Sequence, residues 1–247
     1  MAVSPVAVAV AVEVLAEALA SEKVLNTIDQ QSLFYLDQVR YKHILSIPEL
    51  SVPTGRITCI LGPSGSGKTT FLRLLNKMIS PDSGNIYYQS EDIKQIKSVF
   101  LRRRVCLLSQ EPRIFEGNVR DNLLQGIRFH QKPFPSDEVL KTTLHQVKLG
   151  KGLEEDCVRF SGGEKQRLAL ARILLLKPEV FLLDEPSSSL DDATEELIIE
   201  RVTQEARNAQ KSLIMVTHSS LIAQKYGEYI IHFSEEQSPS ISGAKHG

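Results

Sequence analysis

Short apolar runs alternate with amphipathic stretches along most of this chain, and the alternation is clearest from Leu33 onward. Runs rich in β-branched residues and bounded by Gly, Pro or polar clusters predict strands. Stretches whose apolar residues recur every three or four positions predict helices, because that spacing puts them on one face. Strands are therefore expected at 36–41, 44–52, 56–61, 105–109, 180–183, 212–216 and 229–233, and helices at 68–79, 119–124, 137–147, 163–176, 192–207 and 221–225.

Strands that alternate with helices predict an α/β fold, in which a parallel sheet is covered by helices on both faces. Residues 111–160 carry only helix and loop signals, so they predict a helical subdomain inserted into that core. The main domain is expected at 31–235, and the Ser- and Gly-rich residues 236–247 are expected to be a flexible tail. The Ala-, Val- and Glu-rich residues 1–30 predict an N-terminal extension, either a docking or oligomerisation helix or an add-on segment foreign to the native protein.

Composition and charge exclude several classes of function. A formal net charge of -1 gives no electrostatic reason to expect a nucleic-acid partner. The three cysteines lie far apart, so no CxxC pair exists, and Cys59 and Cys106 are expected to be buried thiols in a reducing cytosol. No stretch reaches the ~18–20 apolar residues needed to cross a bilayer, because Glu13 and Glu17 interrupt the nearest candidate. Any work at a membrane would therefore need a separate partner.

A glycine-rich turn follows the strand expected at 56–61 and precedes a helix. Its pattern, G-x-x-x-x-G-K-T, is that of a loop whose backbone amides curl around phosphate oxygens. Lys68 is expected to reach the β- and γ-phosphates, and the Thr69 hydroxyl is expected to bind Mg²⁺. The residues expected to hold the nucleotide here are Gly62, Pro63, Ser64, Gly65, Ser66, Gly67, Lys68, Thr69 and Thr70.

Two acids end the apolar strand expected at 180–183. Asp184 follows an entirely apolar run, and a buried carboxylate at such a position requires a purpose. We expect Asp184 to bind Mg²⁺ through water and Glu185 to act as the general base for the attacking water. The alternative is a surface strand end that happens to carry two acids.

A third motif, Phe160-Ser-Gly-Gly-Glu164, leads into the helix expected at 163–176. With the two motifs above, it resembles the Leu-Ser-Gly-Gly-Gln motif of nucleotide-binding subunits of ATP-binding cassette (ABC) transporters. Phe160 and Glu164 depart from that pattern. The resemblance covers about residues 33–234. It implies a P-loop NTPase core with a mostly parallel sheet, an N-terminal antiparallel β subdomain and an inserted helical subdomain.

The resemblance implies roles for further residues. Gln110 matches a glutamine that senses Mg²⁺ and the attacking water, and His218 matches a histidine that contacts the γ-phosphate. Tyr41 is the candidate to stack on adenine, with Phe34 and Tyr35 as neighbours that are open to a core role instead. The stretch Ser189-Leu-Asp191 resembles a loop that communicates across a dimer, so Asp191 joins the expected nucleotide site together with Ser161, Gly162 and Gly163.

These matches imply an ATPase that uses ATP and Mg²⁺ and works as a head-to-tail pair of copies. The phosphate loop of one copy would face Ser161 to Gly163 of the other. Residues 112–122 resemble the surface that receives a membrane permease, which would hold the subunit at the cytoplasmic face of the membrane. The form of this segment is similar to that of exporters, and the whole chain is similar to small bacterial subunits assigned to metal (iron) export.

A second function class is a soluble mechanical ATPase of the same family, acting in DNA repair or translation. Repair members carry a long coiled coil or zinc inserts, and translation members carry two cassettes. This chain has one cassette and neither insert. The basic run Arg102-Arg-Arg104 is open to two interpretations, an anion-binding patch or a solvated helix end before a core strand.

Overall fold

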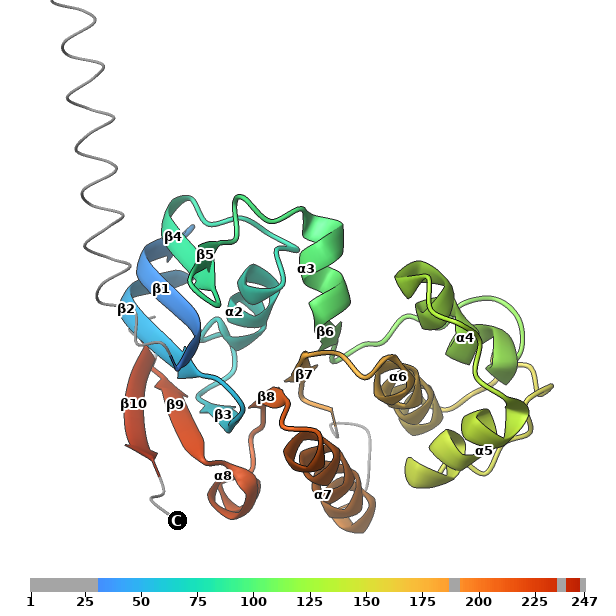
Figure 1. Ribbon diagram of the computed structural model, residues 1–247. Coiled ribbons are helices and arrows are strands. Elements are labelled where there is room, and N and C mark those ends of the chain that lie inside the picture. Colours follow the sequence, from blue (N-terminus) through green and yellow to red (C-terminus); the bar gives the residue numbers. More distant parts are fainter. Residues whose placement is uncertain (1–30, 187–191, 235–238, 245–247) are drawn as a thin grey trace, which may run out of the picture.

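The computed structural model describes residues 31–186, 192–234 and 239–244, and these form two sheets flanked by helices (Figure 1). The strands are β1 (Ser32–Tyr41), β2 (Leu45–Pro53), β3 (Ile57–Leu61), β4 (Ser83–Tyr88), β5 (Glu91–Asp92), β6 (Val105–Leu108), β7 (Val180–Asp184), β8 (Ser212–Val216), β9 (Tyr229–Phe233) and β10 (Pro239–Ala244). The helices are α2 (Lys68–Leu75), α3 (Ser98–Arg104), α4 (Val119–His130), α5 (Asp137–Gln146), α6 (Gly162–Leu176), α7 (Asp192–Asn208) and α8 (Ser220–Tyr226).

The larger sheet has the strand order β10-β9-β3-β8-β7-β6 within the described residues. From β9 to β6 every neighbouring pair is parallel, and only β10 runs antiparallel. Because the parallel strands all end at the same edge, the loops that follow β3, β6, β7 and β8 lie together. The prediction of an α/β fold with a mostly parallel sheet is confirmed.

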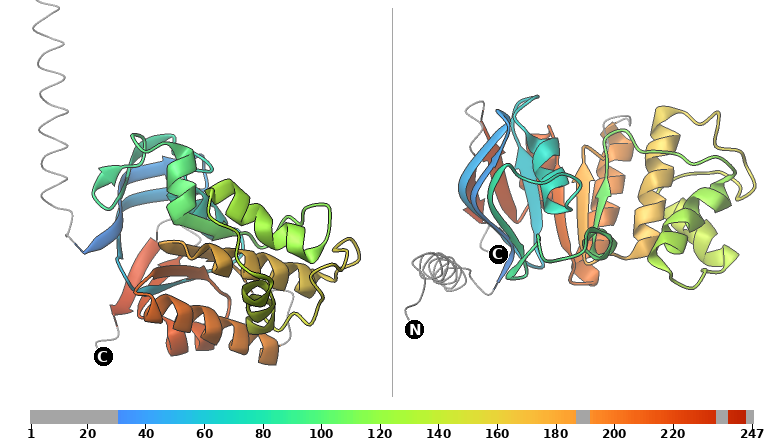
Figure 2. Two further views of the ribbon diagram at one scale, coloured as in Figure 1. Left: turned by 45° about the vertical axis from the view of Figure 1, so that its right-hand side comes forward. Right: turned by 90° about the horizontal axis from the view of Figure 1, so that it is seen from above.

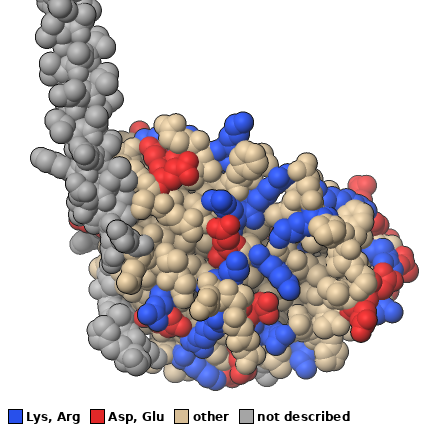
Figure 3. Space-filling view, in the orientation of Figure 1, with Lys and Arg blue, Asp and Glu red and all other residues tan. Residues whose placement is uncertain are grey.

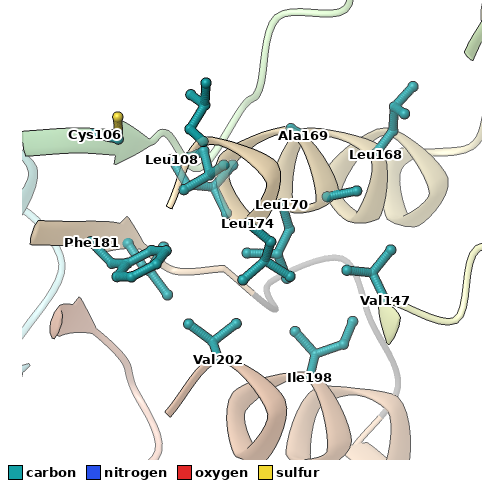
Figure 4. Close-up of a cluster of buried hydrophobic side chains, with 14 of the residues drawn as sticks. Cys106, Leu108, Val147, Leu168, Ala169, Leu170, Leu174, Phe181, Ile198 and Val202 are labelled. Carbon is teal, nitrogen blue, oxygen red and sulfur yellow. The ribbon is translucent and has the colours of Figure 1, made fainter. Parts of the chain in front are cut away.

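Both faces of this sheet are buried, which explains its uninterrupted apolar runs. Successive side chains point to opposite faces, so Val180 and Leu182 pack with α2 while Phe181 and Leu183 pack with α6 and α7. Figure 4 shows Phe181 from β7 beside Leu174 of α6, with Val202 and Ile198 of α7 opposite. A fully buried side chain of this size stabilises the fold by about 1.5–3 kcal/mol.

The smaller sheet is antiparallel, with the order β2-β1-β4-β5. Its inner face joins the cluster around α2 through Phe34 and Leu36, among others, and Phe34 packs against Tyr88. The helical insertion lies at the opposite end of the molecule, where α4 and α5 pack on α6 (Figure 2). The implied antiparallel β subdomain and the inserted helical subdomain are therefore both present.

Several elements differ from the prediction. The strand expected at 36–41 begins at Ser32, the helix expected at 119–124 extends to His130, and neither β5 nor α3 was expected. The helix expected at 68–79 ends at Leu75, because Lys77 turns left-handed (φ 56°) and the Met78 and Ile79 amides donate to the Arg73 carbonyl. The strand β4 was not expected, since its pairing with β1 is a long-range contact that local pattern does not carry. The flexible tail expected at 236–247 contains β10, which pairs with β9 and so satisfies backbone groups that would otherwise form a sheet edge.

Arg102-Arg-Arg104 forms the end of α3, directly before β6. This placement supports the second of the two interpretations, a solvated helix end before a core strand. Within the described part of the chain, Arg104 pairs with Glu179 and Arg102 donates to the Lys77 carbonyl. Cys59, Cys106 and Cys157 are all buried free thiols, as expected for the first two. Among the described helices, none has the length and apolar character needed to cross a membrane. The extension predicted at 1–30 lies outside the described residues.

Candidate functional site

The glycine-rich turn joins the carboxyl end of β3 to the start of α2. Gly67 adopts φ 93° directly before the first helical residue, and a Cβ there would lie 2.6 Å from Cδ2 of Leu45. A Cβ on Gly62 would lie 2.5 Å from the carbonyl oxygen of Phe233. Only glycine therefore fits at these two positions, and the turn brings the free backbone amides of the first turn of α2 to face the loop.

Lys68 points back into the turn and is almost fully buried. Its Nζ donates to the carbonyls of Gly62 (2.9 Å) and Pro63 (2.8 Å). Burial lowers the pKa of Lys68 from its ordinary value, and the negative charges of Glu185 and Asp184 oppose that shift. A cation and a helix N-terminus thus converge on one loop, which is the arrangement that favours a phosphate group.

Asp184 ends β7 on the neighbouring part of the sheet edge and is 2% exposed. The Thr69 hydroxyl donates to its Oδ1 at 3.1 Å. Burial raises the pKa of Asp184, and the hydrogen bond from Thr69 opposes that shift. The buried carboxylate and the hydroxyl are oxygen ligands of the kind that Mg²⁺ prefers, so these two residues fit the ion.

Glu185 follows β7 in a left-handed conformation (φ 48°), with its amide bonded to the Val216 carbonyl. Gln110, two residues after β6, donates from Nε2 to Oε2 of Glu185 at 2.8 Å. His218, two residues after β8, lies with Nε2 2.6 Å from Oε1 of Glu185. Three strand ends therefore fix one carboxylate through both of its oxygens.

Most of these groups line a cavity of about 390 Å³, whose lining does not include Gly62 or Asp184. The volume of the cavity lies within the range of small-molecule sites. Ile44 is the lining residue that the sequence did not single out, and its position at the start of an expected strand gave no chemical signal. The lining residues are Ile44, Ser64, Gly65, Gly67, Lys68, Thr69, Thr70, Gln110, Glu185 and His218.

The three aromatic residues that are candidates to stack on adenine differ in how deeply they are buried. Phe34 packs on Tyr88 in the core, and Tyr35 packs on Tyr87 while its hydroxyl donates to Glu49. Tyr41, at the end of β1, is only partly buried, and Lys42 Nζ lies 5.3 Å from its ring centroid. Tyr41 remains the accessible aromatic of the three, and its contact with adenine stays a prediction.

The Ser161-Gly162-Gly163 motif begins α6 and is not among the lining residues of this cavity. Ser161 is exposed, and its hydroxyl accepts from the Glu164 amide at 3.3 Å. Phe160, which replaces the family's leucine, is buried in the core cluster of the helical insertion and so keeps the apolar role of that position. Asp191 lies outside the described residues.

Comparisons with known proteins give the family and the fold of this chain. Residues 45–188 match the family model described as ABC transporter. The chain is 35% identical over 187 residues to ABC transporter I family member 17 of Arabidopsis thaliana, covering 76% of this chain and 71% of that protein. It is 39% identical over 192 residues to phosphate import ATP-binding protein PstB 2 of Mycobacterium tuberculosis, covering 72% and 68%. It spans only 14% of ABC multidrug transporter E of Aspergillus fumigatus, at 34% identity.

Two solved structures share the fold. One is a dimeric ATP-binding cassette in a post-hydrolysis state bound to ADP and Pi, with a TM-score of 0.76 at 24% identity, covering 87% of this chain and 99% of that chain. The other is a bacterial Atm1-family ABC exporter with ATP bound, with a TM-score of 0.76 and 39% of that chain covered. The family match covers more than half of this chain, and the phosphate loop and the two acids meet at one edge of the parallel sheet. The chain therefore belongs to the ABC transporter family and carries its ATP-binding ATPase domain.

Proposed function

We propose that this chain is the ATP-hydrolysing subunit of an ABC transporter and that it drives a separate permease from the cytoplasmic face of the membrane. The observation that carries this proposal is the Glu185 carboxylate, held through both oxygens by Gln110 and His218 at the wall of the phosphate-loop cavity. A carboxylate fixed in this way is suited to accept a proton from an attacking water. Glu185 would then be the general base.

Binding and charge neutralisation fall to the other lining residues. Lys68 and the loop amides would hold the β- and γ-phosphates, replacing the carbonyl contacts that Lys68 makes within the loop. His218 would orient the γ-phosphate, and Gln110 would position the water next to Glu185. Phosphoryl transfer needs chiefly positioning and charge stabilisation, which these groups supply.

Mg²⁺ is the cofactor that the oxygen donors fit. Thr69 and Asp184 would hold it, since their oxygens already face each other at 3.1 Å, and Gln110 would complete the site from the end of β6. When bound, the ion neutralises charge on the phosphate oxygens. Burial raises the pKa of Asp184, and a cation bound beside it would lower that pKa and favour the ionised carboxylate.

The dimer is part of the same proposal. Ser161 and Gly162 are exposed and Gly163 is half-buried at the start of α6, and none of the three lines the cavity of its own chain, so a phosphate that they bind would come from elsewhere. A head-to-tail pair of copies would bring each Ser-Gly-Gly motif to the phosphates held by the other copy. Asp191 would contribute at the same junction. One copy alone would bind ATP and hydrolyse it poorly.

The permease would dock in a groove between the core and the helical insertion. The groove has a volume of about 340 Å³, and its lining includes Phe115 and Phe129 as well as Arg102 and Arg113. Figure 3 shows several Lys and Arg side chains across the middle of the face, with a few Asp and Glu side chains among them. A short cytoplasmic helix with apolar residues and at least one carboxylate would complement this surface.

The transported substrate is the most specific element of the proposed function. We propose metal (iron) export, which rests on the resemblance of the sequence to small bacterial subunits of that class. The relatives include proteins named for phosphate import, so the fold and the ATP site do not select a cargo. The permease that binds the groove carries the selectivity, and its identification tests this part.

Phe129→Asp tests the docking groove. The Phe129 side chain is 60% exposed, so the substitution should leave folding intact while it removes an apolar contact and adds a charge. Loss of about 2–3 kcal/mol of apolar burial weakens permease binding by roughly 30- to 150-fold. The measurement is co-purification of a membrane permease with the tagged chain from detergent extracts, together with the ATPase rate of the chain alone, which should not change.

Phe134→Asp is the matched control, because Phe134 is equally exposed at 60% and does not line the groove. It should co-purify the permease as the unmodified chain does. Equal loss in both variants would refute the groove as the docking site. Stimulation of the ATPase rate by DNA or ribosomes, with no permease recovered, would favour the soluble mechanical ATPase instead.

A further inference from the structure

Glu164 places a negative charge at the helix start that is proposed above to meet a phosphate group. It lies in the first turn of α6, and its Oε2 accepts from the Ser161 amide at 2.8 Å while the Ser161 hydroxyl accepts from the Glu164 amide. This reciprocal cap fixes the backbone of Ser161. The same helix start is the one proposed above to receive the γ-phosphate of the partner copy, and a carboxylate there repels an anion.

Lys151 compensates this charge from the loop that precedes the motif. Its Nζ lies 3.1 Å from Oε1 of Glu164 and 3.7 Å from Oε2 of Glu155, and 5.1 Å from the ring centroid of Phe160. The Glu164 and Lys151 side chains are only 23% and 29% exposed, so water screens the pair less than it would a fully exposed one. One ammonium group thus contacts both residues at which this motif departs from the family pattern.

The ionisation of the pair follows from its contacts. The pKa of Glu164 lies below its ordinary value, first because the Ser161 amide donates to the carboxylate and then because Lys151 does. The pKa of Lys151 lies above its ordinary value, chiefly because of Glu164. Both groups are therefore charged near neutral pH, and their charges cancel next to the helix start.

We propose that Lys151 is a positioning residue that neutralises Glu164 and holds Ser161 ready for the γ-phosphate of ATP bound to a second copy of this chain. This inference rests on the proposed function, because it requires a site completed in trans. The glutamine found at this position in the family needs no such partner, since it is uncharged. Lys151 and Glu164 are then a matched pair: the carboxylate caps the helix more strongly, and the ammonium removes its cost to phosphate binding.

The test uses the variant Glu185→Gln, which should accumulate the ATP-bound dimer. Lys151→Met in that background should raise the dimer dissociation constant in ATP by roughly tenfold or more, since a charge next to each γ-phosphate is no longer balanced. The affinity of a single copy for a fluorescent ATP analogue should stay the same, because Lys151 does not line the cavity of its own chain. Sedimentation velocity across a concentration series measures the first quantity.

Adding Glu164→Gln to Lys151→Met removes the unbalanced charge, so it should restore the dimer to within about twofold, as charge compensation requires. Lys151→Arg, which keeps the charge, should dimerise as Glu185→Gln alone does. Lys148→Met is the matched control, because it removes the same charge from an exposed position three residues earlier, and it should change nothing.

The outcomes distinguish the role of Lys151 from the formation of the head-to-tail dimer. A dimer of unchanged affinity in Lys151→Met/Glu185→Gln would overturn the inference and leave the head-to-tail dimer standing. Failure of Glu164→Gln to restore the dimer would also overturn it, because loss of packing alone is not relieved by removing a second charge. Absence of any ATP-dependent dimer in Glu185→Gln would overturn the site completed in trans and this inference with it.

Discussion

Glu185→Gln should lower the turnover number for ATP by roughly 10²- to 10⁴-fold, the usual contribution of a general base, while ATP still binds. The amide keeps the shape of the side chain and can still contact Gln110 and His218, which hold the carboxylate at 2.8 and 2.6 Å. It cannot accept a proton from water. Because ATP then stays intact between two copies, the variant should also accumulate as a dimer.

Single-turnover and steady-state phosphate release measure the loss, and equilibrium binding of an ATP analogue shows whether affinity is kept. Glu91→Gln is a suitable control, because it makes the same change at an exposed position in the antiparallel sheet, and it should hydrolyse ATP at the unmodified rate. If Glu185→Gln turns over ATP at the unmodified rate, Glu185 is not the general base, and the proposed mechanism is wrong at its central step.

The polar residues that follow β6, β7 and β8 could be foreseen, because each of these strands has a strong local pattern. Asp184 and Glu185 end an apolar run, and His218 follows another, so the parallel sheet brings them to the loop that holds Lys68. The parallel pairings of β6 with β7, β7 with β8 and β8 with β3 bring these strand ends together. The carboxyl-edge rule for open α/β sheets predicts this placement.

What could not be foreseen depends on contacts between distant segments. The strand β4 exists because it pairs with β1, and β10 exists because it completes the edge beside β9. Neither pairing leaves a periodic signal in the short segment itself. Ile44 lines the cavity only because β2 begins beside the loop, and Lys151 meets Glu164 only because the loop folds back over the start of α6.

Gly62→Ala should lower the free energy of unfolding by about 3 kcal/mol or more, since an overpacked methyl group and a strained backbone both contribute. A methyl group at this position would lie 2.5 Å from the Phe233 carbonyl oxygen and 2.9 Å from its Cβ, on the neighbouring strand β9. Neither atom is the end of a flexible side chain, so relief requires β3 and β9 to separate or the loop to leave its place. Urea unfolding followed by circular dichroism measures the change.

Gly65→Ala separates this clash from the general cost of losing a glycine in the loop. Gly65 also has a left-handed backbone, with φ 81°, but a Cβ there would meet no atom within 4 Å. Gly65→Ala should therefore lower the free energy of unfolding only by the strain of the left-handed conformation, about 1–2 kcal/mol. If the two variants unfold at the same urea concentration, close packing against β9 does not shape the loop. If Gly62→Ala alone loses both stability and ATP binding, the packing of β3 against β9 holds the loop in the shape that receives phosphate.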